Sequence, residues 1–130
     1  MLPKELRDKA KIQLILKFIG KKIYDEFKKK NKLFGNVKKD LALLQKYFRK
    51  NKYFVNSQVT WSDKKRFKHI ISGPVIYESS RDIYNELGFS VNLVSKVMEA
   101  YFNEYKIKVF EKHFNPYQTN KKIIEFWEFK

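Results

Sequence analysis

The sequence predicts an α+β fold that is mostly helical, with amphipathic N-terminal helices, a short β element and a β-type C-terminal end. Two patterns support this prediction. Apolar residues recur at steps of three and four near the N-terminus and again over residues 91–105, as in helices with one buried face. Residues 53–61 instead alternate, as in a half-buried strand. The chain has 130 residues, 17% of them aromatic, which is enough for one ordered domain over residues 1–130.

The N-terminal region is predicted to form two amphipathic helices. The first covers Lys4–Lys30 and has a weak point at Gly20, inside its apolar stripe. The second covers about Val37–Lys50 and is capped by Asn36. The stripe of the first helix is Ile12, Ile15, Ile19, Ile23 and Phe27, and that of the second is Val37, Leu41, Leu44 and Phe48. Lysines cover the remaining surface, which is either a solvated face or a face toward a polyanion.

The middle of the chain combines strand signals with helix signals. Tyr53–Trp61 is rich in β-forming residues and is predicted to be a strand. Ser62-Asp63 can cap a helix, which predicts a short basic helix over Lys64–Ile71 that ends at Gly73-Pro74. Near the C-terminus, Ile123–Phe129 is predicted to be extended.

The net charge of +15 is confined to residues 1–70. That half holds 21 of the 29 Lys and Arg but 6 of the 14 Asp and Glu, whereas residues 71–130 hold 8 of each sign and are neutral. Such a balance favours a nucleic acid or an acidic protein surface as the partner of the basic half. The candidate nucleic-acid-binding residues of this half are Lys21, Lys22, Lys28, Lys29, Lys30, Lys46, Arg49, Lys64, Lys65, Arg66 and Lys68.

The neutral half contains a helix–turn–helix-like stretch over residues 83–105. Ser79-Ser80-Arg81-Asp82 is predicted to open its first helix, Gly88 to end that helix and Ser90 to cap the second one. The run Gly88-Phe89-Ser90-x-x-x-Val94-x-Lys96-Val97-x-x-Ala100-Tyr101-Phe102-x-Glu104 resembles the Gly-Leu-Ser turn and second helix of the HU/IHF family of DNA-architectural proteins. Asn115-Pro116-Tyr117-Gln118-Thr119 is similar to the Asn-Pro-Gln-Thr tip of that family's DNA-binding arm.

The HU/IHF resemblance, which covers residues 83–119, implies a role for each part of this half. In the family the helix pair builds a dimer core, so the apolar residues of the second helix would form a subunit interface. These residues are Val94, Val97, Met98, Tyr101, Phe102 and Tyr105. The arm proline of the family wedges between base steps, a role that Pro116 would inherit. HU/IHF-like chains also occur among the structural genes of tailed bacteriophages.

Two functions therefore stay open at this point. The first is a non-enzymatic structural or architectural protein, HU/IHF-like, that serves as a phage virion subunit in a head–tail or collar ring near a DNA path. The second is an HU/IHF-like or helix–turn–helix protein that binds nucleic acid non-specifically as a dimer. Both imply self or homologous subunits as partners and a location in a virion or in the cytoplasm. The mass of the native particle would separate them.

Catalytic chemistry is not expected from this sequence. His69 and His113 are more typical of surface or packing residues than of catalysts. No cluster of Cys and His predicts a metal site, and no cofactor is expected. The apolar run over residues 14–19 is interrupted by Lys17 and is too short to span a membrane, so no membrane partner is predicted.

Overall fold

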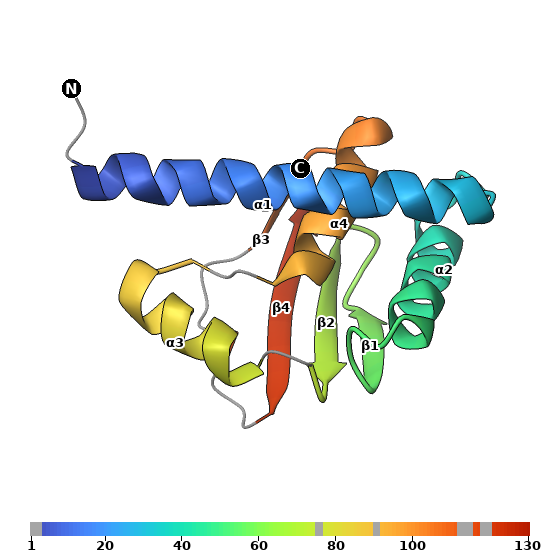
Figure 1. Ribbon diagram of the computed structural model, residues 1–130. Coiled ribbons are helices and arrows are strands. Elements are labelled where there is room, and N and C mark those ends of the chain that lie inside the picture. Colours follow the sequence, from blue (N-terminus) through green and yellow to red (C-terminus); the bar gives the residue numbers. More distant parts are fainter. Residues whose placement is uncertain (1–3, 75–76, 90–91, 112–115, 118–120) are drawn as a thin grey trace.

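The computed structural model describes residues 4–74, 77–89, 92–111, 116–117 and 121–130, and it has the α+β architecture that the sequence predicted (Figure 1). Its elements are α1 (Lys4–Lys30), α2 (Val37–Lys50), β1 (Asn56–Trp61), β2 (Arg66–Ser72), α3 (Tyr77–Leu87), α4 (Leu93–Glu104), β3 (Val109–Glu111) and β4 (Lys122–Phe129). Both predicted N-terminal helices and the C-terminal strand are confirmed, and the strand predicted over residues 53–61 is present as β1.

The four strands of the described residues form one antiparallel sheet in the order β1-β2-β4-β3. β2 lies inside the sheet and pairs with β1 on one side and with β4 on the other. The helix predicted over Lys64–Ile71 is therefore wrong. Phe67, His69 and Ile71 are buried, while the residues between them are more exposed, as in a strand with one covered face. Backbone pairing on both sides outweighs the local capping signal of Ser62-Asp63.

The helices α4 and α1 form two successive layers over the sheet. α4 packs on the strands: the ring centroid of Phe102 lies 5.9 Å from that of Trp127 in β4 and 6.4 Å from that of Phe67 in β2. α1 then crosses α4, and at the crossing Gly20 lies directly against Lys96. Figure 1 shows the N-terminal part of α1 extending past the sheet. This part of the helix has its surface open on several sides.

The stripe that the sequence predicted for α1 is covered in part. Phe27 is buried and the other isoleucines of the stripe are half-buried, but Ile15 is 58% exposed and Tyr24, outside the stripe, is buried. The covered face is centred on Gly20, which the sequence suggested only as a weak point. Two helix backbones can approach this closely only where one of them carries no side chain, so α1 is rotated to place the glycine at the crossing.

The helix–turn–helix-like stretch starts and ends differently from the prediction. α3 begins at Tyr77, ahead of Ser79-Ser80-Arg81-Asp82, and Gly88 ends it with a φ of 79°, as expected. Asn92 caps α4, because its side chain accepts a hydrogen bond of 3.2 Å from the Val94 amide. Ser90, the predicted cap, lies outside the described residues. Tyr84 packs on Tyr117, with 5.6 Å between ring centroids, which ties α3 to the C-terminal segment.

Candidate functional site

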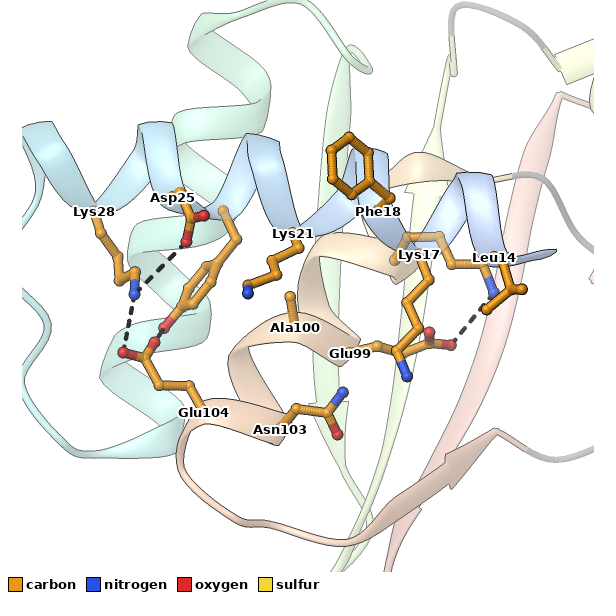
Figure 2. A pocket seen from close by; sticks show the side chains of 12 residues that line it. Leu14, Lys17, Phe18, Lys21, Asp25, Lys28, Glu99, Ala100, Asn103 and Glu104 are labelled. Atoms are coloured by element: carbon orange, nitrogen blue, oxygen red, sulfur yellow. Dashed lines mark hydrogen bonds and ion pairs between the residues drawn. The ribbon is translucent and has the colours of Figure 1, made fainter. Parts of the chain in front are cut away.

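A groove of about 770 Å³ runs between α1 and α4 (Figure 2). Its walls mix apolar and charged side chains. Leu14, Lys17, Phe18, Lys21, Asp25 and Lys28 line it from α1, and Lys96, Glu99, Ala100, Asn103 and Glu104 line it from α4. The two helices meet at Gly20, so the groove opens along one side of their crossing. A concave surface with a few charged groups on apolar walls is typical of binding sites.

One end of the groove is closed by a polar network around Glu104. The hydroxyl of Tyr24 donates a hydrogen bond to this carboxylate, and Lys28 Nζ donates a second one of 2.9 Å. Burial, together with the hydrogen bond to Glu104, raises the pKa of the Tyr24 hydroxyl. Burial also acts to raise the pKa of Glu104, but the hydrogen bonds from Tyr24 and Lys28 outweigh it and leave that pKa below its ordinary value. Glu104 is therefore ionised and fixes α1 to the end of α4.

Helix α1 carries three large apolar side chains that are open to solvent, and we call them the α1 apolar patch. Leu14 is 66% exposed, Ile15 58% and Phe18 61%. Lysines lie on the same exposed surface, and Lys22 Nζ sits 5.3 Å from the ring centroid of Phe18. Single exposed apolar residues are ordinary, but three within five positions of one helix mark a contact surface.

A second group of polar residues lies deep between the sheet and α4. His69 of β2 faces Glu125 of β4, with 3.5 Å between Nδ1 and Oε1, and both side chains are fully buried. Burial lowers the pKa of His69 to about 4 and raises that of Glu125 to about 7. Asn92 Nδ2 donates a hydrogen bond of 3.3 Å to Glu125 Oε2. Neither partner lines the groove, so this pair belongs to the core.

The basic residues proposed from the sequence are spread over several elements. Lys21, Lys22, Lys28, Lys29 and Lys30 lie on α1, Lys46 and Arg49 on α2, Lys64 and Lys65 in the β1–β2 turn, and Arg66 and Lys68 on β2. Some of them form ion pairs within the chain: Lys28 with Glu104 at 2.9 Å, Lys29 with Glu26 at 2.8 Å and Arg66 with Asp63 at 3.4 Å. Pro116 is buried. The structure brings only Lys21 and Lys28 of this set to the groove.

The residues proposed for a subunit interface lie mostly in the core of the chain itself. Val94, Val97, Met98, Tyr101 and Phe102 are each at most 3% exposed, while Tyr105 is 39% exposed at the end of α4. α1 and the sheet cover the apolar face of α4 from two sides. The dense apolar spacing is thus explained by burial in one chain, because α4 is the middle layer of the fold.

Sequence reasoning missed two carboxylates that hold the helices together. Asp40 is buried and accepts hydrogen bonds of 2.6 Å from the Tyr101 hydroxyl and 2.7 Å from the Phe34 amide. Glu104 entered the sequence analysis only as the last residue of the run that resembles the HU/IHF helix. The sequence did contain a signal for a buried carboxylate: Asp40 stands beside Leu41, next to the apolar stripe of a lysine-rich helix. His113, by contrast, lies outside the described residues.

The described residues contain no group of three His, Cys, Asp or Glu side chains arranged to hold a metal ion. Within the same part of the chain, no helix combines the length and the apolar character needed to cross a membrane. The candidate site therefore consists of the groove between α1 and α4 and the neighbouring α1 apolar patch.

No protein-family model and no curated protein matches this sequence. Among solved structures, the chain is similar to a trafficking protein particle complex subunit 3 from Naegleria fowleri, determined with palmitic acid covalently bound. The two superpose with a TM-score of 0.60 at 13% sequence identity, over 99% of this chain and 84% of the other. At that identity the likeness concerns the fold, and it extends over nearly the whole of the chain.

This likeness corrects the interpretation drawn from the sequence. The fold is that of a trafficking-complex subunit, so the assignment to the HU/IHF family is wrong, together with the helix–turn–helix reading that went with it. The two functions based on that family, a phage virion subunit and a nucleic-acid-binding dimer, are wrong with it. The similar structure is a subunit of a complex, and nothing in the comparison supports a nucleic acid as partner of this chain.

Proposed function

We propose that this chain is a non-enzymatic subunit of a protein assembly and that the α1 apolar patch is the surface covered by its partner. The exposure of Leu14, Ile15 and Phe18 on one helix carries the proposal. Interfaces are built around large apolar side chains within a polar rim, and this patch has both parts. The similarity to a subunit of a multi-protein complex supports an assembly role.

The charge around the patch favours a partner that is a different protein. Lys11, Lys17, Lys21 and Lys22 are exposed and lie within a few residues of the patch. Two copies meeting through this surface would bring these lysines together, and like charges across an interface are strongly unfavourable. The expected partner therefore presents an apolar groove that is rimmed by Asp and Glu.

The non-enzymatic part of the proposal rests on the accessible chemistry. His69 is buried and does not line the groove between α1 and α4. The carboxylates of the groove are engaged: Glu104 with Tyr24 and Lys28, Asp25 with Lys28 at 3.9 Å, and Glu99 with Lys96 at 3.5 Å. The sequence contains no cysteine, so an acyl chain cannot be held as a cysteine thioester.

A photo-crosslinking amino acid at position 15 tests where the partner binds. In cells of the source organism it should capture one discrete protein, whereas the same probe in place of Val55, which is 73% exposed and lies far along the chain from the patch, should not. Capture of a second copy of this chain, of lipid, or of the same protein from both positions would contradict the proposal.

The double variant Ile15→Asp/Phe18→Asp should then weaken binding to the purified, identified partner by about 100-fold, because it places charges in the apolar centre of the interface. Its melting temperature should stay close to that of the wild type, since both side chains are exposed. The control Val55→Asp should bind normally. Equal affinities of the double variant and the wild type, measured by titration calorimetry, would rule out the α1 apolar patch.

A further inference from the structure

A second cavity of about 490 Å³ lies where the end of α4 meets β3 and β4. Its apolar lining includes Phe102, Val109 and Trp127. Four lysines surround it: Lys17, Lys106, Lys108 and Lys130. It shares Lys17, Glu99 and Asn103 with the groove of Figure 2 and continues from it along α4. We call it the basic cavity.

The charge of the basic cavity stands out against its surroundings. Residues 71–130 are neutral as a whole and hold 8 basic residues, and three of these, Lys106, Lys108 and Lys130, converge on this one cavity. Glu99 is the carboxylate among the described lining residues, and its Oε1 lies 3.5 Å from Lys96 Nζ. Glu99 is therefore already engaged. Lys17, Lys106 and Lys108 alone outnumber Glu99 in this lining, so the cavity carries an excess of positive charge, which an anion would neutralise.

Lys106 holds its place in the cavity in a backbone conformation that favours glycine. It follows α4 with a φ of 56°, its amide donates to Asn103 O at 3.1 Å, and the Ile107 amide donates to Phe102 O at 2.9 Å. This is the helix-ending arrangement in which glycine is the usual residue, and α3 does end with Gly88. A lysine in this conformation is strained.

The end of α2 provides a matched comparison. Lys52 has a φ of 62°, its amide donates to Arg49 O at 3.1 Å and the Tyr53 amide donates to Phe48 O at 3.0 Å. The local geometry thus equals that of Lys106, but Lys52 lies outside the basic cavity. Any property that Lys106 has and Lys52 lacks must come from the cavity and not from the turn.

We propose that the basic cavity binds a small organic anion, in which an apolar body carries a phosphate or a carboxylate group. The lysines would hold the anionic group, and the half-buried side chains of Ile107 and Val109 would contact the apolar body, above the buried rings of Phe102 and Trp127. The volume suits a small ligand. None of Leu14, Ile15 and Phe18 lines this cavity, so the proposal does not depend on the assembly role.

Four probes separate the two parts of the ligand. Octyl phosphate and octanoate carry both parts, octanol carries only the apolar body, and inorganic phosphate carries only the anionic group. In titration calorimetry, at least one of the first two should bind about 10-fold more tightly than octanol and inorganic phosphate, and the tighter of the two identifies the preferred group. Equal binding of octanol and both anionic probes, or no binding of any probe, would overturn the proposal.

Variants at the matched lysines locate the site. Lys106→Gly and Lys52→Gly should each raise the melting temperature, by about 2–4 °C, because both relieve a strained backbone. Lys106→Gly should weaken binding of the preferred probe about 5-fold or more, and Lys108→Gln should do the same without touching a strained residue. Lys52→Gly should bind as the wild type does. Equal losses at Lys52 and Lys106, or no loss at Lys106 and Lys108, would contradict the assignment.

The two tryptophans give a local readout. The indole N–H of Trp127 should shift in NMR spectra when the probe is added, while that of Trp61, which does not line the basic cavity, should not. The Ile15→Asp/Phe18→Asp variant should retain this shift. The anion site and the partner surface can therefore fail or succeed independently.

Discussion

Replacing Gly20 with valine is expected to lower the free energy of unfolding by about 3 kcal/mol, because the new side chain has no room at the crossing of α1 and α4. A Cβ atom at this position would lie 2.6 Å from Lys96 Cβ, 2.7 Å from its carbonyl carbon and 2.8 Å from its carbonyl oxygen. Two of these three atoms belong to the backbone, so α4 itself would have to move. Urea denaturation at neutral pH measures the loss.

The alanine variant sharpens this test. In an exposed helix, alanine in place of glycine stabilises by about 1 kcal/mol, so a net loss in Gly20→Ala would show that the contact with Lys96 outweighs helix propensity. Valine in place of Gln13, an exposed residue of the same helix, should change stability by about 0.5 kcal/mol or less. If Gly20→Val unfolds at the same urea concentration as the wild type, α1 does not pack on α4 through this glycine.

The sequence was sufficient for those elements whose pattern is local. Asn36 caps α2 through its side chain, which accepts from the Lys39 amide at 3.1 Å, and the apolar spacing of that helix matches its buried residues Leu41, Leu44 and Phe48. β4 alternates Ile123, Glu125 and Trp127 on its buried face, which the β-rich composition indicated. In such segments the local preference and the tertiary packing agree.

The sequence was not sufficient where a distant partner decides. The alternation in β2 contains His69, whose polar side chain does not predict a buried position. In the structure His69 lies opposite Glu125 of β4. The position of Gly20 determines which face of α1 is buried, because Lys96 of α4 lies directly against this glycine. The sequence alone does not show that contact. The groove combines helices far apart in the chain, as the hydrogen bond between Tyr24 and Glu104, 80 positions apart, illustrates. The spacing of residues within one segment cannot predict contacts between segments that are far apart in the chain.

The HU/IHF resemblance failed for a related reason. A turn glycine followed by a regularly apolar helix, as in Gly88 and Val94–Phe102, occurs wherever one helix ends and a buried helix follows. Here the second helix, α4, is buried between α1 and the sheet, and this burial explains its apolar spacing. The likeness to the trafficking subunit was found from the arrangement of the whole chain, at an identity of 13%.

The buried pair of His69 and Glu125 leads to the last prediction, in which two single variants respond to pH in opposite directions. In the folded chain, burial favours the neutral forms and sets the pKa of His69 to about 4 and that of Glu125 to about 7. Asn92, Ser95 and Trp127 act to lower the pKa of Glu125, and the charge of Glu99 acts to raise it. Between pH 4.5 and 6.5, the folded pair and the same residues of the unfolded chain each hold one proton, so the pair adds little pH dependence to stability in the wild type.

When one partner is removed, the titration of the other makes the free energy of unfolding depend on pH. In Glu125→Gln the remaining His69 has a folded pKa below its ordinary 6.5. Its contribution to the free energy of unfolding is therefore fully present above pH 6.5 and is lost as the pH falls toward 4. In His69→Gln the remaining Glu125 has a folded pKa above its ordinary 4.5. Its contribution to the free energy of unfolding is therefore fully present below pH 4.5 and is lost as the pH rises toward 7. Each slope should be about 1.4 kcal/mol per pH unit, relative to the wild type.

The measurement is the free energy of unfolding of both variants and the wild type, from urea titrations at several pH values within this window. Relative to the wild type, Glu125→Gln should gain stability with rising pH and His69→Gln should lose it. The exposed Glu26 supplies the control, because Glu26→Gln alters a surface ion pair with Lys29 and should leave the slope nearly unchanged. Slopes of the same sign in the two core variants, or slopes no steeper than the control, would mean that water reaches the pair and that burial does not set its protonation.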